Sequence, residues 1–188
     1  MKIGCVLVMY NPQQELLTTS LNALNEQVDE VFLGDNSVNM PDFITTLLDL
    51  YPNTYYHGFN KNLGIAEAQN RGIIYFQKKG FDFVLFMDQD SLAPKNLVSS
   101  LLADYNRLKE IGVAIGGIGP RPFNRGEGKP YVGAVKKGKL ILPKITEVGE
   151  IISSASLIPI SHFKQVGGME SSLFIDGVDH EWCWRAKK

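Results

Sequence analysis

The chain has 188 residues, of which 44% are hydrophobic and 21% are charged, with a formal net charge of −1. These values are typical of one soluble globular domain, and the near-neutral charge excludes a protein that binds nucleic acid through bulk positive charge. No stretch approaches the roughly 20 apolar residues of a membrane span, and two cysteines form no disulfide framework, which favours a reducing, cytoplasmic compartment.

The first half of the chain alternates between short apolar runs and helical patterns. The apolar run near the N-terminus is too short for a secretory signal and is followed by polar residues, which again indicates a cytoplasmic protein. Apolar runs predict buried strands at residues 2–9, 31–33, 54–57, 83–87 and 113–118. Helical spacing predicts helices at residues 12–25, 41–51, 65–78 and 94–109. This alternation predicts a mostly parallel sheet with helices on both faces.

The second half has a different pattern. Residues 119–130 are rich in glycine and proline and show no periodicity. Short strands of antiparallel character are predicted at residues 131–135, 140–142 and 151–159, with a turn at Lys137-Gly138. A helix at residues 161–166 ends at Gly167-Gly168, and a last helix covers residues 178–186. The fold class is therefore α/β, a Rossmann-like sheet with a small antiparallel extension.

Basic residues gather between positions 119 and 144. Seven stand against one acid, Glu127: Arg121, Arg125, Lys129, Lys136, Lys137, Lys139 and Lys144. They are compatible with a solvated, mobile flap, or with a lid that faces the phosphates of a bound anion.

Two aspartates follow the strand predicted at residues 83–87. If the backbone stays extended past Met87, Asp88 and Asp90 point to the same side, because side chains alternate with period two. Two such carboxylates can hold one hard divalent cation, with a diphosphate supplying further oxygens. The alternative is that both residues only cap and solvate the strand end.

Polar residues also follow the strand at residues 31–33. Asp35, Asn36 and Ser37 can form an Asx-type turn. They can equally present hydrogen-bonding groups to a nucleotide base, whose ring N–H an aspartate would accept.

A Gly/Asn loop leads into the helix at residues 65–78. Free N–H groups at that helix start, near Asn62 and Gly64, suit a phosphate group, and Arg71 could reach the same ligand. Alternatively, the glycines serve turn and packing, and Arg71 forms a surface ion pair.

The start of the last helix is acidic and aromatic. Carboxylates such as Asp176, Asp179 and Glu181 can simply cap a helix and complement its dipole. Trp182 and Trp184 add an aromatic density that is common where a sugar is bound. Asp179 is the candidate general base for an acceptor hydroxyl.

Taken together and in order, these motifs resemble the inverting family 2 glycosyltransferases of the GT-A fold, especially their rhamnosyltransferase-like branch. The resemblance covers nearly the whole chain and rests on residues 8–11, 34–37, 60–66, 70–72, 86–90, 167–169 and 174–182.

The resemblance implies a role for particular positions. Asp35 would hold the base, Asp90 and Asp88 would bind Mg²⁺ or Mn²⁺, and Asp179 would deprotonate the acceptor. Glu181 and Trp182 would shape the acceptor side. The residues implied in nucleotide-sugar binding are Tyr10, Asn11, Asp35, Asn36, Asn62, Gly64, Arg71, Asp88 and Gln89.

The function implied is metal-dependent, inverting transfer of a sugar from a nucleoside diphosphate donor, dTDP-rhamnose or a UDP-sugar. The acceptor would be a bacterial surface polysaccharide or a lipid-linked glycan, and the full-length protein could associate with the inner face of the plasma membrane. One domain, residues 1–188, would divide into a nucleotide-binding half to about residue 118 and an acceptor-side half. The resemblance also implies truncation at the C-terminus.

Two other functions are open. A sugar-phosphate nucleotidyltransferase also has an α/β nucleotide-binding sheet, but it would need a glycine-rich activating loop with Arg and Lys near the first strand, where residues 11–14 offer none. A nucleotide-sugar binding fragment without turnover is the other alternative.

Overall fold

The computed structural model describes residues 1–187 except 122, 125–128 and 131–137. Its helices and strands, in chain order, are β1 (Ile3–Met9), α1 (Gln14–Leu24), β2 (Glu30–Asp35), α2 (Ile44–Leu50), β3 (Thr54–Gly58), α3 (Gly64–Lys78), β4 (Phe83–Asp88), α4 (Leu97–Glu110), β5 (Phe123–Asn124), β6 (Lys129–Pro130), β7 (Lys139–Leu142), β8 (Ile145–Glu147), β9 (Leu157–Pro159), α5 (Ile160–Val166), the 3₁₀ helix η2 (Ser171–Leu173) and α6 (Val178–Ala186).

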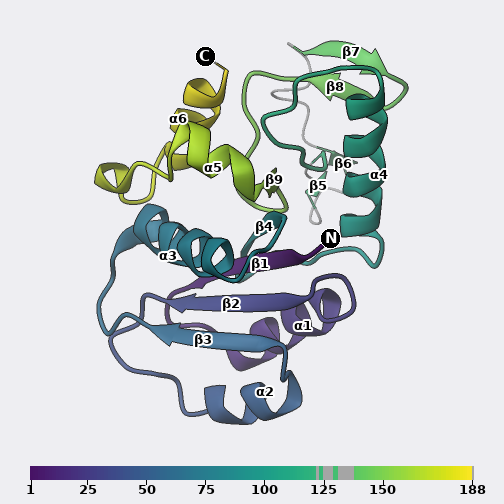
Figure 1. Ribbon diagram of the computed structural model, residues 1–188. Coiled ribbons are helices and arrows are strands. Elements are labelled where there is room, and N and C mark those ends of the chain that lie inside the picture. Colours follow the sequence, from purple (N-terminus) through teal and green to yellow (C-terminus); the bar gives the residue numbers. More distant parts are fainter. Residues whose placement is uncertain (122, 125–128, 131–137, 188) are drawn as a thin grey trace.

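A five-stranded sheet in the order β3-β2-β1-β4-β9 forms the centre of the molecule (Figure 1). Strands β1 to β4 run parallel to one another, and only β9 pairs antiparallel, with β4. Two small antiparallel pairs, β5–β6 and β7–β8, lie outside this sheet. The α/β class with a mostly parallel sheet and a small antiparallel extension is thus confirmed.

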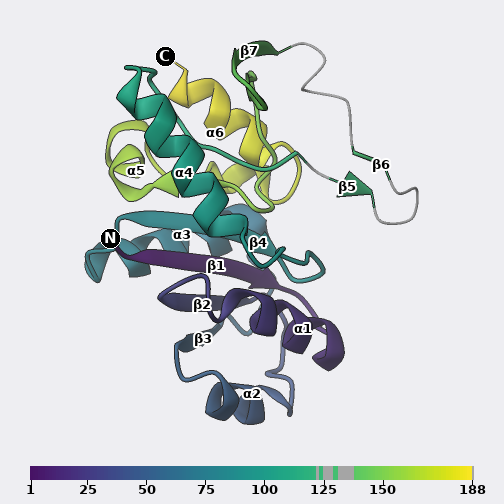
Figure 2. The ribbon, with the colours of Figure 1, turned by 90° about the vertical axis from the view of Figure 1, so that its right-hand side faces the viewer.

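Helices cover both faces of the sheet, as the sequence predicts. Alternate residues of each strand point to opposite faces, so Leu7 packs in the core under α1, α2 and α4, while Val6 packs in the core under α3, α5 and α6. Figure 2 shows α1 and α3 on opposite sides of the strands. Both cores are made of apolar side chains, which explains why the central strands β1 and β4 are almost uniformly hydrophobic.

The predicted strand at residues 113–118 is wrong. Only Ile118 is in register, through an isolated antiparallel bridge to Leu157. Gly116 and Gly117 have no side chains to pack in a strand, and β9 takes the place beside β4. Likewise, only residues 157–159 of the strand predicted at 151–159 are extended in a ladder. The predicted strand at 131–135 and the turn residue Lys137 lie outside the described residues.

The parallel strands end at one edge of the sheet. Met9 is in register with Asp35, and Val8 with Asp88. The carboxyl ends of β1, β2 and β4 are therefore aligned, at the edge where open α/β sheets bind their ligands.

Candidate active site

Strand β4 ends at Asp88, and the chain turns at once. The N–H of Ser91 donates to the carbonyl of Asp88 at 3.1 Å, so residues 89 and 90 form a turn instead of continuing the strand. The extended backbone that would place both aspartates on one side is therefore absent. The two carboxylates nevertheless interact, because the charge of Asp90 acts on Asp88.

Asp88 carries an unfavourable charge in this environment. Burial raises its pKa above the usual range, and a hydrogen bond with the Ser154 side chain only partly offsets this. The neighbouring carboxylates of Asp90 and Asp179 raise the pKa further. Three carboxylates from β4, the following turn and α6 thus share one region of negative potential.

This electrostatic arrangement predicts that Asp88→Asn stabilises the metal-free protein. A carboxylate with a raised folded-state pKa costs stability above that pKa, and the cost fades as the pH falls through it. We expect the free energy of unfolding at neutral pH to rise by about 1 kcal/mol, and the gain to disappear toward acid pH. Urea unfolding without divalent cations would measure both effects.

The matched control is Asp49→Asn, because Asp49 lies exposed on α2, where surface changes stay within about 0.5 kcal/mol. A loss of stability in Asp88→Asn would show that favourable contacts of the carboxylate outweigh the cost of its burial and of repulsion by Asp90 and Asp179.

Asp179 reaches this region through the loop before β9. One carboxylate oxygen, Oδ2, accepts from the backbone N–H of Ser153 at 3.0 Å. The neighbouring hydroxyl of Ser154 bonds that of Ser91 at 2.8 Å and also contacts Asp88. Residues 153 and 154 therefore connect the start of α6 to the end of β4, although the two are far apart in the sequence.

The end of β4 offers two carboxylates, Asp88 and Asp90, which could hold a divalent cation only together with further ligands from a bound molecule. No group of three or more His, Cys, Asp and Glu side chains that could hold a metal ion occurs among the described residues. Asp88 and Asp90 would be the protein ligands of Mg²⁺ or Mn²⁺, with diphosphate oxygens completing the coordination. A cation there would favour the charged form of Asp88, whose pKa is raised chiefly by burial and further by Asp90 and Asp179.

A hollow of about 240 Å³ opens beside Asp90. It is lined by Asn11, Pro12, Gln13, Leu16, Leu17, Gln89 and Asp90. The side-chain amide of Gln89 fixes its wall: it accepts from the Tyr10 N–H at 2.9 Å and donates to the Tyr10 carbonyl at 3.2 Å. The structure thus brings Tyr10, Asn11, Gln89 and Asp90 together, and their role in ligand binding stays a prediction.

Asp35 is fully buried, with an exposed fraction of 0%. Its two oxygens accept from the Ser37 N–H at 2.8 Å and the Tyr56 hydroxyl at 2.9 Å. Burial, and then the bond with Asp35, raise the pKa of Tyr56, so this donor stays protonated. The Asx-turn alternative accounts for Asp35 in this structure. Base recognition by Asp35 stays a prediction, and it requires the fully buried carboxylate to become accessible to a ligand.

The start of α3 is already supplied with acceptors from the protein. Asn36 Oδ1 accepts from the Leu63 N–H at 2.9 Å, and Asn62 Oδ1 accepts from the Gly64 N–H at 2.9 Å. Arg71 is 55% exposed and pairs with Glu67, one helical turn away, at 2.8 Å. These contacts favour the structural alternatives for Asn62 and Arg71, and phosphate binding by this helix start stays a prediction.

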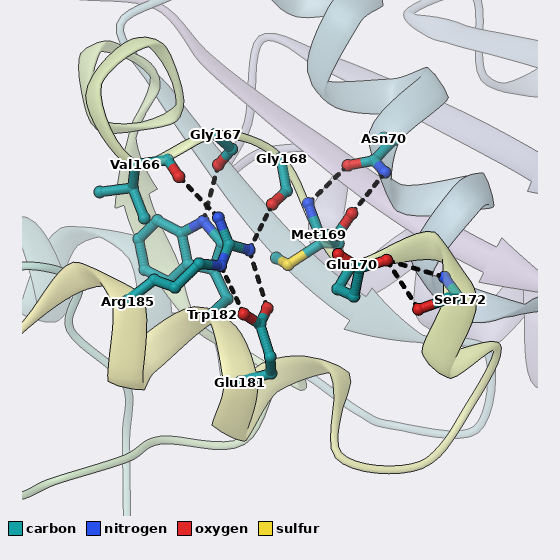
Figure 3. Close-up of polar contacts among 10 residues, drawn as sticks. All are labelled: Asn70, Val166, Gly167, Gly168, Met169, Glu170, Ser172, Glu181, Trp182 and Arg185. Carbon is teal, nitrogen blue, oxygen red and sulfur yellow. Dashed lines mark hydrogen bonds and ion pairs between the residues drawn. The ribbon is translucent and has the colours of Figure 1, made fainter.

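The predicted acceptor-side residues belong to a network at the base of α6 (Figure 3). Trp182 is only 2% exposed, and its indole N–H donates to the Gly167 carbonyl at 3.0 Å. Glu181 accepts from Arg185, which also donates to the carbonyls of Val166 and Gly168, both at 2.6 Å. In this structure Trp182 is therefore a core residue that cannot stack on a sugar.

Two contributors to the site, Ser153 and Ser154, lie outside every sequence motif. Ser153 and Ser154 fall in a stretch whose apolar residues suggest a strand, so their bonds to Asp179 and Asp88 could be found only from the fold. His180 lies with Nδ1 3.0 Å from Glu150. The sequence offers no signal for this last pairing, because 30 positions separate the two residues.

Known proteins resemble this chain in sequence and in fold. Residues 5–166 match the family model described as glycosyl transferase family 2. The chain is 32% identical over 194 aligned residues to the dTDP-rhamnosyl transferase RfbF of Shigella flexneri. The alignment covers 97% of this chain and 62% of that protein, so the chain spans less than two thirds of this curated relative.

Solved structures share the fold. The crystal structure of S. aureus TarS superposes with a TM-score of 0.73 at 17% identity, over 99% of this chain and 33% of that one. The complex of TarS 1–349 with UDP gives 0.72 at 18% identity, over 99% and 55% of the two chains. GalNAc-T7 with UDP, GalNAc and Mn²⁺ gives 0.70 at 13% identity, over 98% and 40%.

Proposed function

The chain belongs to glycosyl transferase family 2, and we propose that it transfers a sugar from a nucleoside diphosphate donor to a hydroxyl acceptor with inversion. The observation that carries the proposal is that the charges of Asp90 and Asp179 act on Asp88 at the carboxyl edge of the sheet, with Ser154 bonded to Asp88 and Ser153 to Asp179. Family membership disfavours the nucleotidyltransferase alternative.

In the proposed reaction, Asp179 accepts the proton of the acceptor hydroxyl as its oxygen attacks the anomeric carbon. The bond from that carbon to the diphosphate breaks on the opposite face, so one displacement inverts the centre. When bound, Mg²⁺ or Mn²⁺ supplies positive charge that neutralises the leaving diphosphate. Asp179 is suited to its role because the N–H of Ser153 fixes the orientation of its carboxylate.

The proposed donor is dTDP-rhamnose, with UDP-sugars as the alternative. The first rests on the similarity to RfbF, which is named a dTDP-rhamnosyl transferase, and the second on the UDP complex of TarS, which shares only the fold. The nucleotide-binding half, to about residue 118, would hold the donor, with Tyr10, Asn11 and Gln89 beside it. Residues 119–188 would face the acceptor, and Glu181 and Trp182 would shape that side from beneath.

The proposed acceptor is a growing surface polysaccharide or a lipid-linked glycan. A lipid-linked acceptor would place the reaction at the inner face of the plasma membrane. No helix among the described residues has the length and apolar character needed to cross a membrane.

Donor turnover tests the proposal. The protein would be incubated with Mn²⁺ and, in turn, dTDP-rhamnose and UDP-GlcNAc, with a bacterial glycan extract as acceptor. We expect release of the nucleoside diphosphate from one donor and a glycoside of inverted anomeric configuration by NMR. Retained configuration would contradict the mechanism. Binding of a donor without turnover would instead support the alternative of a binding fragment.

A further inference from the structure

Helix α3 holds the chain between α5 and α6 through the side chain of Asn70. Its Oδ1 accepts from the Met169 N–H at 2.7 Å, and its Nδ2 donates to the Met169 carbonyl at 2.8 Å (Figure 3). One amide thus satisfies both backbone groups of one residue, as a neighbouring strand would. A Cβ on Gly168 would lie 2.4 Å from Asn70 Oδ1, so the close approach requires glycine there.

The amino end of α3 makes a second contact with the same segment. The N–H groups of Ile65 and Ala66 donate to the carbonyl of Phe174 at 2.7 and 3.3 Å. Gly64 has a φ of +80°, and a Cβ on it would lie 2.5 Å from that carbonyl oxygen. Gly64 therefore makes room for the Phe174 carbonyl, which takes the place that the sequence suggested for a phosphate.

Phe174 has a strained backbone conformation where it makes this contact. Its φ of 59° and ψ of −67°, with the Ile175 N–H donating to the Leu173 carbonyl at 2.6 Å, form a γ-turn of positive φ. Such a backbone conformation is rare and strained, and it persists only where its surroundings hold it. The hydrogen bonds from the start of α3 to the Phe174 carbonyl help to hold this conformation.

The other end of the segment is attached to α6. Arg185 donates to the carbonyls of Val166 and Gly168, and Trp182 to that of Gly167. The guanidinium is itself fixed by Glu181 at 2.8 Å. Segment 166–174 is therefore bonded to α6 on one side and to α3 on the other, and α3 packs on β1 and β2.

We propose that Asn70 is a positioning residue for Asp179, an inference that rests on the proposed function. Together with the amide groups after Gly64, it fixes segment 169–174 on α3 and so sets where α6 begins. Loss of the contacts between α3 and segment 169–174 would displace Asp179 from Asp88 and leave the donor-binding residues unchanged. The amino end of α3 thereby serves the acceptor-side base and not the donor phosphate.

Asn70→Ala tests the proposal, with Asn106→Ala on the exposed face of α4 as the matched control. Transfer at saturating donor should fall at least about tenfold, since small misplacements of a catalytic group cost this much or more. Affinity for dTDP with Mn²⁺ should stay within about twofold of wild type. Asn106→Ala should change neither value.

The two tryptophans, Trp182 and Trp184, provide a readout that needs no turnover, because both lie in α6. Bound Mn²⁺ broadens their indole N–H signals in NMR according to distance. Asn70→Ala should change this broadening and also speed the hydrogen exchange of the Trp182 indole N–H, which is bonded to Gly167. The control should change neither signal.

Three outcomes would overturn the proposal. Unchanged broadening and exchange in Asn70→Ala would show that the contacts of Asn70 do not position α6. Lost dTDP affinity with normal turnover would show that this part of α3 serves donor binding. Should Asn70→Ala not fold, Ser171→Ala should shift both signals in the same direction. It removes the contact of the Ser171 hydroxyl with Asn70 Nδ2 at 3.2 Å and its bond to Glu67 of α3 at 2.8 Å. Unchanged signals in Ser171→Ala would also refute the positioning role of Asn70. A wild-type protein that binds neither Mn²⁺ nor dTDP would refute the proposed function only. The hydrogen-exchange measurement would still test whether Asn70 positions α6.

Discussion

Asp179→Asn is expected to lower the rate of sugar transfer by about 10²–10⁴-fold, the range that a positioned general base contributes. Asparagine preserves the shape of the side chain and can still accept from the Ser153 N–H, as Asp179 Oδ2 does at 3.0 Å. It cannot take up the proton of the acceptor hydroxyl. The loss should therefore appear in the turnover rate at saturating donor.

Donor affinity distinguishes a general base at Asp179 from a residue that binds the donor. Because Asp179 adds negative charge near Asp88, its removal should leave the affinity for dTDP with Mn²⁺ unchanged or slightly improved. Asp49→Asn on α2, at the opposite end of the molecule from α6 (Figure 1), should transfer at the wild-type rate. Transfer by Asp179→Asn within about threefold of wild type would eliminate Asp179 as the base.

Asp90→Ala is expected to weaken Mn²⁺ binding in the presence of dTDP by more than 100-fold. Outer-shell changes at metal sites cost about 10–100-fold, and removal of one of only two protein carboxylates should exceed that range. The side chain is exposed, so the variant should fold normally. Electron paramagnetic resonance of free Mn²⁺ during titration would measure the affinity.

The control for this variant is Asp104→Ala on α4, which loses only a surface pair with Arg107 at 2.9 Å. Mn²⁺ affinity equal to wild type in Asp90→Ala would remove Asp90 from the metal site. It would leave Asp88, half-buried and bonded to Ser154, as the protein ligand to test.

Local patterns predicted the central fold well. The apolar runs of β1, β2 and β4 and the helical spacing of α1, α3 and α6 depend on burial by near neighbours, and their predicted bounds lie close to the observed ones. The strand predicted at residues 113–118 was wrong for a tertiary reason. Whether an apolar run joins a sheet depends on which edge is free, and β9 occupies that edge beside β4.

The site could be predicted only in part. Asp88, Gln89, Asp90 and Asp179 lie at the carboxyl edge, as strand ends and helix starts suggest. Asp35 and Trp182 are residues of the types found in ligand sites, but their side chains are only 0% and 2% exposed. Their burial within the protein could not be read from the residue types alone. The contacts of Ser153 with Asp179 and of Asn70 with Met169 join residues distant in the sequence, and only the fold shows them.

Calorimetric titration with dTDP and UDP, each with and without Mn²⁺, tests the central claim most directly. That claim is that the carboxyl edge of the sheet, with Asp88 and Asp90, binds a nucleoside diphosphate together with a divalent cation. We expect dTDP to bind in the presence of Mn²⁺ and far more weakly in its absence, with UDP ranking the base preference. Absence of binding to both nucleotides, in a protein shown to be folded by circular dichroism, would contradict the account, as would equal affinity with and without Mn²⁺.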